Sequence, residues 1–340
     1  MKRILPLFLA LALLLTGCTA VSTTESASQT VSQVDSPSSA LESAPESASS
    51  QLESVGEVSI TDSNGTQITL DTSAPRVVAA YGSFAEAWLL AGGELCGVTQ
   101  DALEQRDLGL PEDIAVVGTV KEPNAEEIIA LEPDLVLLAS DITAQADIRD
   151  VLENAGLACA FFQVDTFADY AFMMEQLCAI TGREDLYEEN VTQVGQQIEE
   201  AQANAALSST RPNVLLIRAF STGIKAKTDD ELAGAILKDL GAHNIADDHP
   251  SMLEDLSLEE VIAADPDYIF VTTMGDEQKA LDYLNGLIQQ NPAWSELSAV
   301  KEDRYIVLPK DLFHYKPNNR WGESYQYLGE ILYPQLFHEE

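Results

Sequence analysis

Residues 124–140 read NAEEIIALEPDLVLLAS, and residues 257–273, 133 positions further on, read SLEEVIAADPDYIFVTT. Each copy begins as a short helical pattern with two glutamates, breaks at Pro-Asp and continues as an apolar strand pattern. A supersecondary unit that recurs at this distance predicts two similar α/β lobes, one behind the other. Since two lobes leave a cleft between them, the repeat also predicts where a ligand binds.

The segments around the repeat predict parallel sheets, because short strand patterns alternate with helical ones. Residues 168–206 differ, since their apolar positions follow helical spacing and Gly182 marks a break or kink. We expect an N-terminal lobe over 55–167, a connecting helix over 168–206 and a C-terminal lobe over 207–340. Among the finer expectations are a hairpin over 58–70, a helix over 83–90 capped by Ser83, and strands at 96–99, 116–120, 135–139, 159–164, 214–217 and 305–308.

The first residues predict export and a lipid anchor. Residues 1–17 combine a basic start with an apolar run too short to span a bilayer, which is typical of a signal peptide. The following Leu15-Thr16-Gly17-Cys18 resembles the lipobox of bacterial lipoproteins, which implies acylation of Cys18; an ordinary signal with an incidental cysteine is the alternative. Residues 18–54 are Ser-rich and contain no aromatic residue, Lys or Arg, so we expect a solvated tether.

Composition excludes several classes of function. The formal net charge is −38, and without Lys2 and Arg3 the balance is 16 basic against 56 acidic residues, 16 − 56 = −40. Nucleic acid is therefore not an expected partner. Cys96, Cys159 and Cys178 lie in apolar runs and are expected to be buried thiols. We find no nucleophile elbow, HExxH motif, phosphate loop or metal-ligand spacing, so we expect neither an enzyme nor a bound metal or cofactor.

An ordered set of motifs over roughly residues 55–335 resembles the substrate-binding proteins of bacterial ABC importers for ferric siderophores, haem and cobalamin. The motifs are Arg76-Val77-Val78-Ala79, Val117-Gly118, Pro123-Asn124-Ala125-Glu126 and Pro133-Asp134-Leu135-Val136, with weaker counterparts at Ser257-Leu258-Glu259 and Pro266-Asp267-Tyr268-Ile269.

The resemblance implies an α/β fold of two Rossmann-like lobes with parallel sheets, joined by one long backbone helix. It also implies a monomeric binding protein, not an enzyme, held by its lipid on the extracytoplasmic face of the cell membrane. Such a protein captures an iron complex, a ferric siderophore in the first place, and delivers it to a permease dimer with its ATPase. Haem or cobalamin is the nearest alternative ligand, and an enzyme or sensor on the same fold is a more distant one.

The paired glutamates of the repeat allow two interpretations. By resemblance, Glu126 and Glu259 dock into the permease, one from each lobe. Helix-start chemistry is the alternative, because Asn124 and Ser257 are N-cap residue types and acids in a first helical turn favour the helix dipole. Glu127 and Glu260 stand at the capping-box position, three residues after each N-cap.

Ligand contacts are expected where the parallel strands end, because open α/β sheets bind ligands beyond the carboxyl ends of their strands. The candidates in the first lobe are Tyr81, Ser83, Thr119 and Ser140; those in the second lobe are Arg218, Lys225, Thr273, Lys310, His314, Tyr315 and Arg320.

The type of ligand is suggested by cations and aromatic residues. Six of the 16 basic residues lie in or just beyond strand ends of the second lobe, which favours an anionic ligand unless they point to solvent. Arg218 and Arg320 rank first, because a guanidinium pairs bidentately with carboxylate or catecholate oxygens. Residues 312–321 (LFHYKPNNRW) could wall a pocket for a large flat ligand or supply ordinary core residues. Tyr81 could stack on a ligand or coordinate haem iron.

Overall fold

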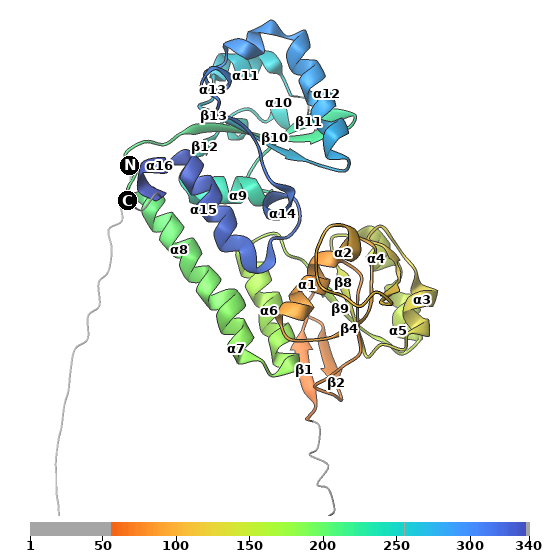
Figure 1. The fold of residues 1–340 in the computed structure, drawn as a ribbon. Coiled ribbons are helices and arrows are strands. Elements are labelled where there is room, and N and C mark those ends of the chain that lie inside the picture. The colour runs from red at the N-terminus through yellow and green to blue at the C-terminus, as the bar shows by residue number, and fades with distance from the viewer. Residues whose placement is uncertain (1–55, 255, 338–340) are drawn as a thin grey trace, which may run out of the picture. The chain divides into compact units, whose positions relative to one another are not determined.

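The computed structural model describes residues 56–254 and 256–337 (Figure 1). The predicted signal peptide, the predicted lipidation site Cys18 and the predicted tether over 18–54 lie outside the described residues. Within the described part of the chain, no helix has the length and apolar character needed to cross a membrane.

The described chain begins with the predicted β-hairpin. Strands β1 (Val58–Thr61) and β2 (Gln67–Leu70) pair antiparallel, with Ile60 opposite Ile68. Gly65 in the turn has a φ of 78°, a left-handed conformation that glycine adopts without steric cost. The hairpin is therefore confirmed.

The first lobe is built on a parallel sheet of strand order β5-β4-β3-β8-β9. Alternate residues of its central strands enter two hydrophobic clusters: Leu135 and Leu137 pack on one face, Val136 and Leu138 on the other. Both faces are thus buried, as parallel sheets require. The elements are β3 (Val77–Ala79), α1 (Gly82–Leu90), β4 (Leu95–Val98), α2 (Asp101–Glu104), β5 (Ala115–Val116), β6 (Gly118–Thr119), β7 (Glu122–Pro123), α3 (Ala125–Ala130), β8 (Leu135–Ala139), α4 (Thr143–Asp147), α5 (Arg149–Asn154) and β9 (Ala158–Phe162).

Two details of the first lobe differ from the expectation. The N-cap of α1 is Tyr81, without a side-chain cap, and Ser83 lies inside the helix. The expected strand over 116–120 is divided, because Gly118 has a φ of 98° and the chain leaves the sheet there. The ribbon β6-β7 that follows is a separate antiparallel pair.

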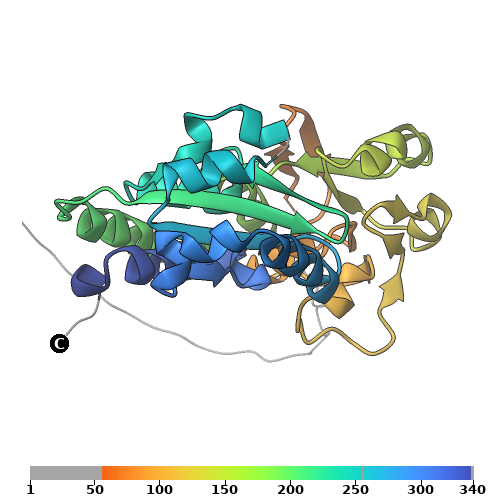
Figure 2. The same cartoon turned by 90° about the horizontal axis from the view of Figure 1, so that it is seen from above.

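The second lobe has the strand order β11-β10-β13-β14, with β12 also paired to β10. Helices lie on both sides of this sheet in Figure 2. The elements are β10 (Asn213–Phe220), β11 (Gly223–Lys227), α9 (Leu232–Asp239), β12 (His243–Asn244), η2 (Ile245–Asp247), α10 (Ser251–Glu254), α11 (Leu258–Ala264), β13 (Tyr268–Thr273), α12 (Glu277–Gln290), η3 (Pro292–Glu296), α13 (Ser298–Lys301), β14 (Tyr305–Val307), α14 (Lys310–Phe313), η4 (Asn318–Arg320), α15 (Trp321–Leu332) and α16 (Pro334–Phe337).

Two strands of this sheet were not predicted, the edge strand β11 and the two-residue β12. β10 runs on to Phe220 instead of ending at Ile217, and β11 returns antiparallel to it, with Phe220 opposite Gly223. The sheet therefore carries one antiparallel edge strand beside its parallel ones. The longer β10 and the added β11 matter for the site, because Arg218 lies within β10 and Lys225 lies on the edge strand β11.

The repeated sequence adopts the same structure in both lobes. Glu132 and Asp265, at equivalent positions before the Pro-Asp break, have left-handed φ values of 47° and 43°. The aspartates of the break then hold the start of a neighbouring strand, β3 in the first lobe and β10 in the second: Asp134 accepts from the Arg76 N–H at 2.7 Å, and Asp267 from the Asn213 N–H at 2.8 Å. The repeat thus encodes one helix-to-strand turn that fixes two neighbouring strands.

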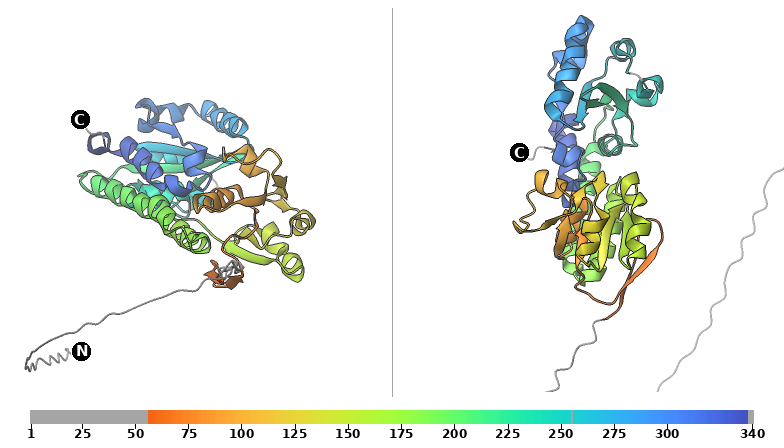
Figure 3. Two further views of the ribbon diagram at one scale, coloured as in Figure 1. Left: turned by 60° about the horizontal axis from the view of Figure 1, so that its bottom comes forward. Right: turned by 90° about the vertical axis from the view of Figure 1, so that its right-hand side faces the viewer.

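The predicted connector is helical and breaks at the expected residue. Helix α6 (Phe167–Thr181) starts with a Thr166–Asp169 capping box and ends at Gly182, whose φ is 67°. The chain then continues through α7 (Glu184–Tyr187), a π-helical turn (Glu188–Thr192) and α8 (Gln193–Ala206). Helix α8 packs along α15, which returns from the second lobe (Figure 1, with two further views in Figure 3).

Candidate functional site

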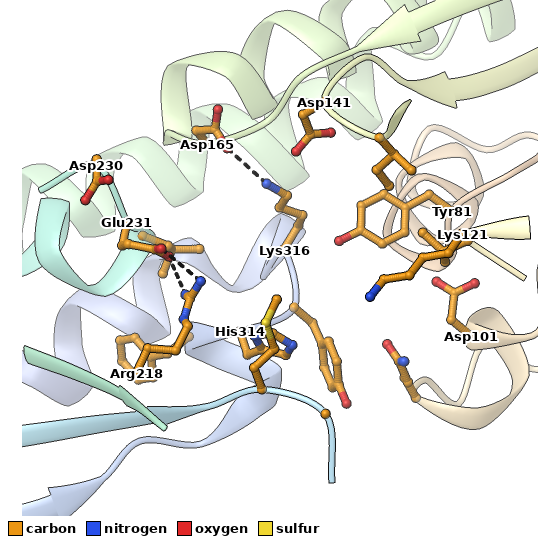
Figure 4. A pocket seen from close by; sticks show the side chains of 18 residues that line it. Tyr81, Asp101, Lys121, Asp141, Asp165, Arg218, Asp230, Glu231, His314 and Lys316 are labelled. Atoms are coloured by element: carbon orange, nitrogen blue, oxygen red, sulfur yellow. Dashed lines mark hydrogen bonds and ion pairs between the residues drawn. The ribbon is translucent and has the colours of Figure 1, made fainter. Parts of the chain in front are cut away.

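A cleft of about 500 Å³ is lined by residues from both lobes (Figure 4). The first-lobe part of the wall is formed by residues that follow β3, β4, β8 and β9 and by the turn between β6 and β7. The second-lobe part is formed by β10, the start of α9, the loop after β13, and the end of α14 with the residues that follow it. The lining residues are Tyr81, Asp101, Gln105, Val120, Lys121, Asp141, Ile142, Asp165, Arg218, Asp230, Glu231, Leu232, Met274, Gly275, Phe313, His314, Tyr315 and Lys316.

Two aromatic groups on opposite sides of the cleft are neutral at pH 7. Burial raises the pKa of Tyr81, and the carboxylates of Asp141 and Asp101 raise it further, so its phenol keeps its proton. Burial also lowers the pKa of His314 to about 4, with help from the cations of Arg218, Lys310 and Lys316. The phenol can donate a hydrogen bond and the imidazole can donate and accept, without adding charge.

Arg218, the highest-ranked candidate, is already paired. Its Nη1 donates to Glu231 Oε1 at 2.9 Å, and its Nη2 forms an ion pair with the other oxygen of that carboxylate. Lys227 Nζ reaches Glu231 Oε1 at 2.7 Å from the neighbouring strand. Both terminal nitrogens of the guanidinium are therefore already paired, bidentately, with a carboxylate of the same lobe.

A second ion pair crosses the cleft. Lys316 of the second lobe lies 3.2 Å from Asp165, which follows β9 of the first lobe (Figure 4). Burial opposes ionisation of Asp165, but the hydrogen bond from Gln163 and the charge of Lys316 together lower its pKa. Lys121 also lines the cleft, and it makes no ion pair with any described residue.

The cleft brings together four of the eleven predicted contact residues: Tyr81, Arg218, His314 and Tyr315. Tyr81 packs edge-on against Phe84 with ring centroids 5.3 Å apart, and His314 and Tyr315 lie at the same separation. The Arg106 guanidinium sits 6.0 Å from the Tyr315 ring, behind the wall of the cleft.

Three first-lobe candidates lie outside the lining. Ser83 is 2% exposed and its hydroxyl accepts from Arg106 at 2.8 Å. Ser140 donates to the Phe162 carbonyl at 3.4 Å, and Thr119 accepts from the Glu122 N–H at 3.1 Å. Each hydroxyl is used by the local fold.

Four second-lobe candidates also lie outside the lining. Thr273 is buried in β13, and Lys225 is exposed on the edge strand β11. Lys310 donates to the Gly275 carbonyl at 2.6 Å, so it holds a lining loop in place. Arg320 is bound by Asp311 and Glu323, both on exposed surface.

Several lining residues were not among the candidates, chiefly Asp101, Lys121, Asp165 and Glu231; Lys316 was one of the six second-lobe cations but not one of the eleven expected contacts. Asp101 and Asp165 follow strand ends by a few residues, so the strand-end rule, taken a little further along the chain, would have included them. Lys121 lies in the β6-β7 turn, and its position depends on the unpredicted division of the strand at Gly118.

The N-caps of the two repeated helices are confirmed. Asn124 accepts from the N–H groups of Glu126 and Glu127 at 3.1 and 3.2 Å, and Ser257 accepts from that of Glu260 at 3.3 Å. The reciprocal half of the capping box is not formed at Asn124, since its N–H donates to the Val117 carbonyl.

The other acids of these helices differ in what they contact. The Glu260 carboxylate accepts from the Ser251 hydroxyl at 3.0 Å. Glu126 and Glu259 are exposed, and neither side chain has a hydrogen-bond or ion-pair partner among the described residues. Helix capping therefore uses the backbone of Glu126 but leaves both of these carboxylates available.

Two α/β lobes with a lined cleft at their facing strand ends define a two-lobed ligand-binding protein. The model of one protein family, described as periplasmic binding protein, matches residues 77–312. The chain belongs to this family.

Two named relatives and one solved structure are similar to this chain at low sequence identity. The Fe(3+)-citrate-binding protein YfmC of Bacillus subtilis is 26% identical over 262 residues, which cover 74% of this chain and 78% of that protein. The high-affinity heme uptake system protein IsdE of Staphylococcus aureus is 22% identical, covering 65% of this chain and 75% of that one. A periplasmic solute binding protein from Veillonella parvula has the same fold, with a TM-score of 0.67, 19% identity, and coverage of 84% and 89%.

Proposed function

We propose that this protein is the substrate-binding component of an ABC importer and that it captures an iron chelate in the cleft between its lobes. The observation that carries the proposal is the cleft itself, whose lining comes from both lobes at their strand ends. Membership of the periplasmic binding protein family and the similarity to an iron-citrate-binding relative support it.

The groups in the cleft support binding without chemistry. Tyr81 and His314 supply neutral polar groups, while Phe313 and Tyr315 supply apolar and aromatic surface. A chelate held between such groups touches both lobes and leaves unchanged. The protein in this proposal is a monomer that passes its ligand to a permease dimer driven by an ATPase.

Docking to the permease is assigned to Glu126 and Glu259. Both are exposed first-turn residues of equivalent helices, α3 and α11, one in each lobe. Two matching acids on one protein suit a partner with two matching basic sites.

The proposed location is the extracytoplasmic face of the cell membrane. The Leu15-Thr16-Gly17-Cys18 sequence supports a lipid on Cys18, and residues 19–54 would serve as the tether. Cys18→Ser should release the protein from membranes on fractionation, whereas continued sedimentation of the cleaved variant would contradict the anchor.

Haem is a second candidate ligand, favoured by one observation. His314 stays neutral at pH 7 because its pKa is about 4, and a neutral imidazole or a tyrosine can hold haem iron. The similarity to the heme uptake protein IsdE is consistent with this ligand.

Calorimetric titration of the full-length chain with ferric siderophores, ferric citrate, haem and cobalamin tests the proposal. We expect one-to-one binding of at least one iron chelate, weakened by Tyr81→Ala. Tryptophan fluorescence is the poorer readout, because Trp88, Trp294 and Trp321 are each 1% exposed and lie outside the lining. Absence of binding to every iron chelate would refute the proposal, and exclusive binding of haem would select the second candidate.

A further inference from the structure

Acidic groups outnumber basic ones on the cleft wall. Five lining residues are Asp or Glu and three are Lys or Arg, so the lining has a formal charge of 3 − 5 = −2. The acids are Asp101, Asp141, Asp165, Asp230 and Glu231; the cations are Lys121, Arg218 and Lys316. This balance differs from the cationic pocket that the basic residues of the second lobe suggest from sequence.

Two of the three lining cations are neutralised by neighbours. Arg218 pairs with Glu231, which Lys227 also contacts from outside the lining, and Lys316 pairs with Asp165. Two cations just outside the lining are also engaged, since Lys310 donates to a backbone carbonyl and Arg106 pairs with Glu86. An anionic ligand would have to compete for these groups, and within the described chain only Lys121 remains unpaired on the wall.

Three lining carboxylates have no cationic partner among the described residues. Asp230 accepts from the Thr228 hydroxyl at 2.8 Å, and Asp141 is exposed beside the cleft. Asp141 and Asp101 both stand on the first-lobe side, near the phenol of Tyr81 (Figure 4). Among the described residues, the first-lobe wall therefore carries two unpaired carboxylates against one unpaired cation, Lys121, and the second-lobe wall carries the unpaired Asp230.

The carboxylate of Asp101 is an independent observation on the first-lobe wall, because one of its oxygens is buried without a donor. It is 8% exposed, and its Oδ2 accepts from the Gly82 N–H at 2.7 Å. Its Oδ1 is buried and has no hydrogen-bond partner within the part of the chain that the structure describes. Leaving a carboxylate oxygen desolvated and unpaired is costly, and a charged donor is the partner that offsets this cost best.

We propose that the wall formed by Asp101, Asp141 and Tyr81 binds a cationic group, and that the iron chelate taken up carries a protonated amine and is not a polyanion. This inference rests on the proposed function, since it specifies the ligand of the same cleft. The ammonium would pair with the two carboxylates, and the ring of Tyr81 adds an aromatic surface that attracts cations.

A matched pair of ligands tests the proposal on the full-length chain. A ferric trihydroxamate with a free primary amine carries one positive charge, and its N-acetylated form has the same iron centre but no charge. We expect the amine form to bind at least about tenfold more tightly, as one charge-assisted contact permits. Ferric citrate and a ferric tris-catecholate serve as the anionic probes and should bind more weakly than either.

Single substitutions show which carboxylates cause the preference for the amine form. Asp141→Asn and Asp101→Asn should each reduce the preference for the amine form severalfold, and asparagine at 101 keeps an acceptor for the Gly82 N–H. Asp147→Asn removes the same charge from an exposed position of the same lobe outside the cleft, and should leave the preference unchanged.

The outcomes separate the inference from the function. Equal affinity for the amine and acetylated forms, or a preference for the anionic chelates, would overturn the inference while the iron-chelate function stands. An equal loss of preference in Asp147→Asn would assign the effect to net charge and would also overturn it. Failure to bind any iron chelate would overturn both.

Discussion

At the scale of single residues, the site depends on which charges are already paired. Arg218, Glu231 and Lys227 form an internal ion-pair network, so the role of Arg218 cannot be inferred from its residue type alone. By residue type, Arg218 and Arg320 are the best candidates for an anionic chelate, because a guanidinium pairs bidentately with carboxylate or catecholate oxygens. The fold instead provides the Arg218 guanidinium with a carboxylate thirteen residues further along the chain.

Glu231→Gln tests this pairing. Removing the carboxylate charge should release Arg218 and Lys227 and increase the affinity for ferric citrate about tenfold, since a charge-assisted contact contributes roughly 1.5–3 kcal/mol. Titration calorimetry measures the change. Glu302→Gln, which breaks an exposed pair with Arg304 away from the cleft, is the control. An unchanged affinity in both variants would mean that Arg218 does not reach the ligand.

His314 predicts a pH dependence of stability. Its pKa is about 4 in the folded protein and 6.5 when unperturbed, so the unfolded chain binds more protons between these values. Stability is therefore retained above pH 6.5 and lost as the pH falls towards 4, by at most about 3 kcal/mol. Denaturant unfolding at pH 7, 5 and 4 should show a smaller loss for His314→Gln than for the natural protein. Identical losses would exclude a buried neutral histidine.

At the scale of elements, the repeat explains why the two lobes could be predicted. Periodicity and the Pro-Asp break identify a helix, a turn and a strand, and the aspartate of that turn binds the start of a neighbouring strand of the same lobe. Such local patterns also identified the hairpin and the break at Gly182. Strand β11 escaped prediction because the residues between Phe220 and Gly223 carry no Asn-Gly type of turn signal.

The contact residues were harder to predict than the elements. A strand end indicates which backbone reaches the cleft, but side-chain direction and pairing decide which groups face it. Ser83 and Thr273 lie beside the correct strands and are buried in the fold. Lys316 and Asp165 meet only because the lobes bring together positions 151 residues apart.

Helices α3 and α11 present the two glutamates that are proposed to dock to the permease. Glu126→Lys combined with Glu259→Lys should abolish iron-chelate uptake by cells while the affinity for the chelate persists. Stability should change little, because a first-turn acid contributes only about 0.3–1 kcal/mol to its helix. Uptake of radioactive iron, calorimetry and thermal unfolding on the same variant provide the three readouts.

The control reverses the same number of charges elsewhere. Glu153→Lys combined with Asp282→Lys changes one exposed acid in each lobe outside the repeated helices, and uptake should remain near normal. Normal uptake in the Glu126/Glu259 variant together with a lowered melting temperature would assign these residues to helix stability alone.

At the scale of the whole molecule, the chain between α14 and α15 joins the second lobe to the first. Asn318 is fully buried and donates to the Ser83 carbonyl at 2.9 Å and to Glu86 at 2.6 Å. Arg106 donates to the Lys316 carbonyl at 2.9 Å, and Lys316 itself reaches Asp165. These contacts lie next to the cleft, so they set how the two walls face each other.

Asn318→Gly should weaken this junction. Glycine tolerates the φ of 52° at this position, so the variant removes the side-chain bonds without straining the backbone. We expect a loss of roughly 1–3 kcal/mol in the free energy of unfolding, together with weaker chelate binding. Asn64→Gly, in the exposed hairpin turn, is the control. A variant as stable as the control would show that the lobes are held by other contacts.

In the proposed function the cleft holds one intact iron chelate. Native mass spectrometry of the full-length chain, after incubation with ferric trihydroxamate, ferric citrate and haem, tests this binding without any label. We expect a mass increase equal to one unaltered iron chelate, lost when Tyr81 and Tyr315 are both replaced by alanine. No iron-chelate adduct, an adduct that survives this double replacement, or a chelate released in altered form would contradict it.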